Sequence, residues 1–99
     1  MLALVRALFV LLLAASAVHA DPATERYAPA QLNVARDLLE AARAYAALGE
    51  WGKASRVAWQ ASFDARLAWG MTESEHLRAE AEEVGSAASA LVVRISARR

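Results

Sequence analysis

Residues 27–68 read YAPAQLNVARDLLEAARAYAALGEWGKASRVAWQASFDARLA. This stretch is rich in alanine, the residue with the highest helix propensity, and its single proline lies near the start. Gly49 lies near the middle, where a glycine can adopt the left-handed conformation that ends a helix. The stretch therefore predicts an antiparallel helical hairpin, with one helix on each side of Gly49.

Each half of this hairpin carries an apolar stripe at the spacing of an α-helix. The stripe of the first half, opened by Pro29 and flanked by Leu38 and Tyr45, consists of Leu32, Ala35, Leu39, Ala42 and Ala46. The stripe of the second half, flanked by Val57, consists of Ala54, Ala58, Ala61, Ala65 and Ala68. We expect the stripes to face each other, because small side chains allow two helix axes to approach closely.

Residues 71–99 predict a third amphipathic helical segment. Thr72 and Glu75 have the spacing of a capping box, which would start a new helix. A third apolar stripe follows at Leu77, Ala81, Val84, Ala88, Leu91 and Ile95. At 100° per residue Leu77 lies about 180° around a continuous helix from Ala68, so one straight helix cannot present both stripes to one partner. Two arrangements remain open: a long second helix, or a break near Gly70 that gives three helices.

Two large aromatic residues, Trp59 and Phe63, lie about 160° from the centre of the alanine stripe. After a break at Gly70 the third stripe would cover them, and we favour this arrangement because apolar stripes usually serve packing. With a continuous helix they would instead form an exposed partner surface, whose candidate residues are Trp59, Phe63, Leu77, Val84 and Leu91. Trp51 and Trp69 are predicted to lie at the rim of the hairpin interface.

The first twenty residues have the pattern of a secretory signal peptide. Arg6 precedes a largely apolar run over residues 7–18, and the run ends in Val18-His19-Ala20, which suits signal peptidase. Ala15-Ser16-Ala17 is a second possible cleavage site. The sequence therefore predicts a signal-peptide helix over residues 1–20 and a periplasmic mature chain, which meets the membrane only during export. An uncleaved membrane anchor is the alternative, although the run is shorter than the roughly 18 residues that span a bilayer.

For residues 21–28 the sequence predicts an irregular lead-in or one loose turn, with Ala28 held out of the helix by Pro29.

Composition limits the possible functions. The chain has 99 residues, enough for one domain, and its 11 basic and 11 acidic residues balance, which argues against nucleic-acid binding. There is no cysteine, so disulfides, thiolate metal sites and lipid attachment through cysteine are not expected.

The chemistry-bearing side chains do not form a catalytic set. His76, with Glu73 and Glu80, makes one half of a carboxylate-bridged di-metal motif, which needs two copies. The serines have no second histidine in the mature chain, and the glycines form no phosphate loop. We therefore expect a protein that is not an enzyme, with no catalytic residues, no metal site and no cofactor.

Several segments of residues 27–68 resemble the bacterial envelope family catalogued as domain of unknown function 4398. They are Tyr27-Ala28-Pro29-Ala30-Gln31-Leu32, Ala35-Arg36 with Leu39, Gly49-Glu50-Trp51 with Ala54, Val57-Ala58, Ala61 and Asp64-Ala65-Arg66-Leu67-Ala68. The resemblance implies a periplasmic or outer-membrane-associated helical hairpin without catalytic residues. Members commonly have a lipid-bearing cysteine and an alanine-rich helix before the Tyr-Ala-Pro motif, and this chain has neither. The turn more weakly resembles one tetratricopeptide unit, but no second copy follows at a period near 34 residues.

These features favour a non-catalytic periplasmic interaction module that self-associates or docks on another envelope protein. The alternatives are a small-ligand or metal-binding carrier and a peripheral protein held by an uncleaved N-terminus. Arg94, Arg98 and Arg99 make a small basic end, which either complements a helix C-terminus or contacts anionic lipid or wall polymer.

We predict that residues 1–20 are removed on export, so that N-terminal sequencing of the periplasmic chain reads Asp21-Pro22-Ala23. A start at Val18 would show instead that the Ala15-Ser16-Ala17 site is used. A membrane-bound product that begins at Met1 would contradict cleavage.

Overall fold

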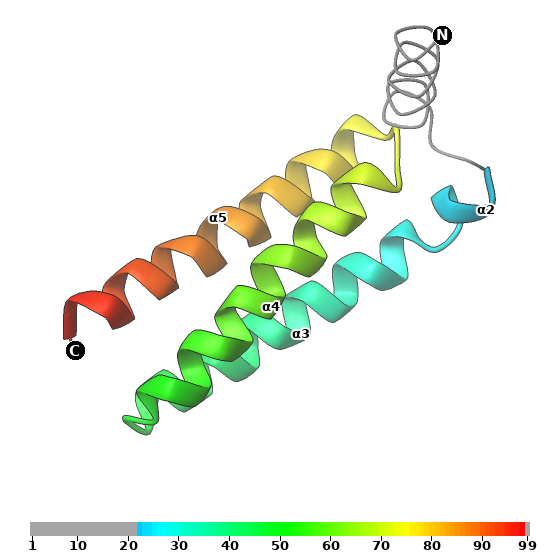
Figure 1. Cartoon of the computed structure of the whole chain (residues 1–99). Helices are drawn as coiled ribbons and strands as arrows, with labels where there is room; N and C mark the ends of the chain where they lie inside the picture. Colours follow the sequence, from blue (N-terminus) through cyan, green and yellow to red (C-terminus); the bar gives the residue numbers. More distant parts are fainter. Residues whose placement is uncertain (1–21, 99) are drawn as a thin grey trace, which may run out of the picture.

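The computed structural model describes residues 22–98, which are mainly helical and contain no strand. The helices are α2 (Pro22–Glu25), α3 (Ala28–Ala47), α4 (Trp51–Gly70) and α5 (Glu75–Arg98). Helices α3 and α4 form an antiparallel pair, and α5 returns along α4 (Figure 1). The all-α prediction is therefore confirmed for this range. The predicted signal-peptide helix over residues 1–20 lies outside the described residues.

The hairpin reverses at Gly49, as predicted. Gly49 has a φ of 76°, which an L side chain rarely adopts. The backbone N–H of Gly49 donates to the carbonyl of Ala46 at 3.0 Å, and that of Glu50 donates to Tyr45 at 2.9 Å. These bonds satisfy carbonyl groups that the end of α3 would otherwise leave unpaired. Helix α4 begins two residues later, at Trp51.

The start of α3 differs from the prediction by one residue. Ala28 was expected outside the helix, yet it is the first helical residue, and Pro29 follows it within the first turn. The residue before a proline only prefers extended backbone, and Ala28 is 1% exposed, so its burial favours the helical position. Of the two forms predicted for the lead-in, the structure has the single turn, α2.

The three predicted stripes form the core. Every alanine of the α4 stripe is buried, and so are Leu32, Ala35, Leu39 and Ala42 of α3. On α5 the buried members are Ala81, Val84, Ala88, Leu91 and Ile95, joined by Val92. Ala46 and Leu77 are partly buried against this core. Helical periodicity therefore identified nearly all of the buried face of each long helix.

The chain breaks between α4 and α5, which gives three long helices rather than one continuous second helix. The predicted capping box of Thr72 and Glu75 is wrong. Ser74 caps α5 instead, because its Oγ accepts the backbone N–H of Leu77 at 3.3 Å. Thr72 is 1% exposed, and its Oγ1 accepts the N–H of Ser74 at 3.0 Å and donates to the carboxylate of Glu25.

Helix α5 lies on the flank of α4 that has the smallest side chains. A Cβ on Gly85 would lie 3.6 Å from the Cβ of Ala65, and the Oγ atoms of Ser62 and Ser89 are 3.3 Å apart. Helix α5 also contacts α3, so each of the three long helices packs against the other two. Each apolar stripe is therefore shared between two neighbours.

Replacing either Ala58 or Ala61 by leucine should overpack the α4 stripe, because both side chains are 0% exposed. We expect each variant to lose about 1–3 kcal/mol in a urea titration followed by circular dichroism. Ala44→Leu on the exposed side of α3 is the matched control and should change little. If the two buried variants unfold at the control's midpoint, this stripe is not the packed face.

Candidate interaction surface

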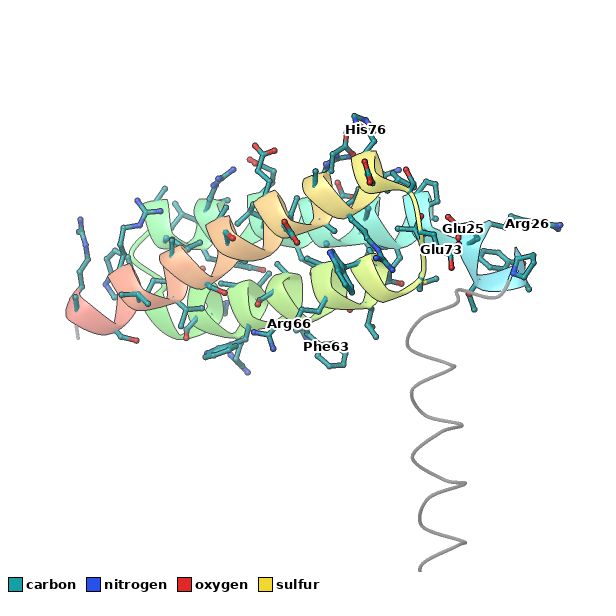
Figure 2. The ribbon with its side chains drawn as sticks, turned by 90° about the horizontal axis from the view of Figure 1, so that it is seen from above. Glu25, Arg26, Phe63, Arg66, Glu73 and His76 are labelled. Atoms are coloured by element: carbon teal, nitrogen blue, oxygen red, sulfur yellow. The ribbon has the colours of Figure 1, made fainter. Side chains whose placement is uncertain are left out.

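The third helix does not cover Trp59 and Phe63, contrary to the arrangement that the sequence favoured. Their exposed fractions are 57% and 61%, although the chain does break after Gly70. Figure 2 shows Phe63 projecting from α4 away from the other two long helices. The structure thus combines one feature of each predicted arrangement: the chain breaks after Gly70, and the two aromatics are exposed.

The position of α5 explains this result. Ser62 and Ala65 allow a close approach, whereas Trp59 and Phe63 would hold a neighbouring backbone farther away. On the serine flank α5 also reaches α3, where Arg36 Nη2 lies 2.6 Å from Glu80 Oε2. A helix laid over the aromatics would lie on the far side of α4 from its stripe and would lose that contact.

The other three residues of the predicted partner surface belong to the fold. Val84 is 7% exposed and Leu91 is 6% exposed, so both are core residues of α5. Leu77 is partly buried and packs against the same core. The structure therefore separates the five predicted residues into an exposed pair on α4 and a packed set on α5.

Apolar residues of α3 and α4 extend the exposed pair into a larger surface. A shallow groove of about 600 Å³ is lined by Leu38 of α3 and by Trp59, Gln60, Phe63 and Asp64 of α4. Val34, 47% exposed, precedes Leu38 by one helical turn, and Leu67, 44% exposed, follows Phe63 by one turn. We call the surface made by Val34, Leu38, Trp59, Phe63 and Leu67 the aromatic face. The sequence reasoning missed its α3 part, although the four-residue spacing of Val34 and Leu38 was visible.

Trp51 and Trp69 lie at the rim of a different interface from the one predicted. The Trp69 ring lies 4.1 Å from the guanidinium carbon of Arg78, and its Nε1 donates to Glu82 at 3.2 Å. The ring of Trp51 lies 5.5 Å from the guanidinium carbon of Arg98. All three partners are on α5, so both tryptophans flank the α4–α5 contact, and Trp51 also lines a groove with residues of α3. Such cation–π contacts stabilise by about 0.5–1 kcal/mol at exposed sites.

His76 contacts a carboxylate that joins two helices. Its Nε2 lies 2.9 Å from Glu80 Oε1, and its side chain is 82% exposed. The other carboxylate oxygen of Glu80 accepts the bond from Arg36 described above. Of the half-motif seen in the sequence, Glu80 thus links α5 to α3. Within residues 22–98 no three His, Cys, Asp or Glu side chains are grouped so that they would hold a metal ion.

Glu25 holds the lead-in turn against the loop between α4 and α5, a contact that sequence reasoning missed. Its carboxylate accepts the Thr72 hydroxyl and the backbone N–H of Glu73, the latter at 3.2 Å from each oxygen. Glu25 and Thr72 are 47 positions apart, and no short-range pattern marks the pair. This contact, the Glu25 clamp, joins residues just after the predicted cleavage site to the start of α5.

None of the helices α2 to α5 has the length and apolar character needed to cross a membrane. No family model, curated protein or solved structure matches this chain. The resemblance to domain of unknown function 4398 therefore stays a prediction carried by the residues quoted for it.

Proposed function

We propose that this chain is an exported, non-catalytic interaction module of the cell envelope, and that it self-associates through the aromatic face. The signal-peptide pattern of residues 1–20 supports export. The observation that carries self-association is the exposure of Trp59 and Phe63 beside an apolar flank of α3.

The composition of the aromatic face supports binding rather than chance exposure. Single exposed apolar residues are normal on a soluble protein, but contiguous apolar patches mark interaction sites. Here two aromatic rings lie next to aliphatic side chains from a second helix, around one groove. Tryptophan and phenylalanine are enriched at the centres of interfaces, and tryptophan is frequent among residues that dominate binding energy.

The outer side of the α3–α4 pair, which contains the aromatic face, is large enough to pair with a second copy of the chain. Helices α3 and α4 have 20 residues each and are therefore about 30 Å long. Two such helices side by side present a face of roughly 600 Å², given interaxial distances of 8–10 Å and helix diameters near 10 Å. A standard interface buries about 800 Å² of accessible surface per partner, so the hairpin face is of the right order.

The charges along α4 suit a two-fold pair. Arg56 and Asp64 lie at similar distances on either side of the middle of α4. In an antiparallel dimer with its two-fold axis near that middle, the arginine of each copy comes level with the aspartate of the other. A two-fold dimer uses the same patch on both copies, which this arrangement allows.

Sedimentation equilibrium of the full chain should show concentration-dependent association, and Trp59→Ala should weaken it about thirtyfold, as loss of a central interface aromatic does. The same variant should melt within a few degrees of wild type, because its side chain is 57% exposed in the single chain.

Val93→Ala is the matched control, since Val93 is 67% exposed on α5 and lies outside the aromatic face. It should leave both melting and association unchanged. Unaltered association of Trp59→Ala, or a wild-type chain that stays monomeric throughout, would rule out this dimer. Severe unfolding of Trp59→Ala would show that the residue serves stability instead.

A further inference from the structure

A second surface feature lies at the end of the bundle where the Gly49 turn meets the C-terminal end of α5. An open groove of about 630 Å³ there is lined by three arginines, Arg43 of α3 and Arg94 and Arg98 of α5. The other lining residues are small or apolar: Ala46, Ala47, Gly49, Trp51, Leu91 and Ile95. We call this the arginine groove. Its lining includes no acidic side chain.

Helix dipoles account for only part of this cluster. Cations are favourable within the last turn of a helix, and of the three arginines only Arg98 occupies that position. Arg43 lies earlier in α3, and Arg94 lies one turn before Arg98. The meeting of three cations from two helices around an apolar floor therefore needs another explanation.

The positive charge of the groove is largely uncompensated. Arg94 and Arg98 have no acidic partner within residues 22–98. Arg43 pairs with Glu40 at 2.7 Å, but both side chains are exposed, and such a pair contributes about 0–1 kcal/mol and exchanges readily. Acidic residues gather instead in the first half of α5, at Glu75, Glu80, Glu82 and Glu83. The molecule thus has a basic end and a more acidic opposite end.

Apolar and amphipathic side chains accompany the arginines at this end. Leu48, at the hairpin tip, is 74% exposed, the largest fraction among the exposed large hydrophobic residues of the described chain. Trp51 is partly buried at the groove, with the Arg98 guanidinium over its ring. Tryptophan and arginine favour the boundary between lipid headgroups and acyl chains, and a leucine beside them can enter that layer.

We infer that the Gly49 end of the bundle docks onto a membrane surface that carries anionic phospholipid. The guanidinium groups of the arginine groove contact headgroup phosphates, and Leu48 enters the interfacial layer beside Trp51. This contact is distinct from the transient one predicted for residues 1–20. It shares no residue with the aromatic face, so each proposal can fail independently of the other.

Vesicle sedimentation tests the inference on the full chain, so that any contribution of residues 1–21 is common to every variant. Binding to vesicles of equal parts phosphatidylglycerol and phosphatidylcholine should exceed binding to phosphatidylcholine alone. Each arginine near an anionic surface contributes about fivefold in partitioning, so Arg94→Gln with Arg98→Gln should lower binding about thirtyfold. Arg94→Gln alone keeps the Arg98–Trp51 contact and should lower binding about fivefold.

The matched control is Arg26→Gln with Arg66→Gln, which removes the same charge from exposed positions outside the groove (Figure 2). It should bind nearly as wild type does. Leu48→Ser should weaken binding at unchanged charge, and circular dichroism should show every variant folded. Equal losses in the two double variants, or no preference for phosphatidylglycerol, would overturn the inference.

Inorganic phosphate at matched ionic strength separates a headgroup from a free anion. We expect it to leave the melting temperature unchanged, because it offers nothing to Leu48 and Trp51. A phosphate-dependent rise in melting temperature that disappears in the Arg94→Gln, Arg98→Gln variant would identify a free-anion site and overturn membrane docking.

Discussion

The structure depends on the close approach of α4 to both of its long neighbours. Five alanines of α4 form the surface that meets them, and Ala54, Ala58 and Ala61 have no measurable exposure. An alanine buries little apolar area, but it loses no side-chain conformational entropy on folding, and close backbones gain many dispersion contacts. A chain of this size has a small core, so these close contacts matter beside the burial of the larger Leu32, Leu39, Leu91 and Ile95.

The same constraint places the large aromatics on the surface. A seam built from alanine, serine and glycine has no space for a tryptophan: a Cβ on Gly85 would already lie in van der Waals contact with Ala65, at 3.6 Å. Trp51 and Trp69 therefore pack at the edges of α5, and Trp59 and Phe63 remain on the side of α4 that neither α3 nor α5 covers. The small side chains that allow the helices to pack closely therefore also leave the aromatic face exposed.

Periodicity predicted the buried face of each long helix, and Gly49 predicted the turn, because both depend on residues close in sequence. Periodicity did not predict on which side of α4 helix α5 packs. An apolar stripe shows which side of its own helix is buried. It does not show on which flank of α4 another helix packs. Helix α5 packs on the flank where the contact is made by small residues, Ser62 of α4 and Ser89 and Gly85 of α5. For the candidate surface this meant that the favoured arrangement, in which α5 covers Trp59 and Phe63, was wrong, and that Val84 and Leu91 of the alternative surface are buried in the core. Thr72, expected as the cap of α5, instead donates to Glu25, 47 positions before it, and a contact over that distance leaves no local pattern in the sequence.

The Glu25 clamp determines how the molecule would respond to a pulling force on the chain that precedes Pro22. The load would reach α2 first, where a few hydrogen bonds hold one short helix against the α4–α5 loop. Opening a four-residue helix lengthens the chain by roughly 8 Å, since an extended residue spans about 3.5 Å and a helical one about 1.5 Å. The long helices share their contacts along their whole length and would keep them. The lead-in turn would therefore open before the contacts between the long helices do.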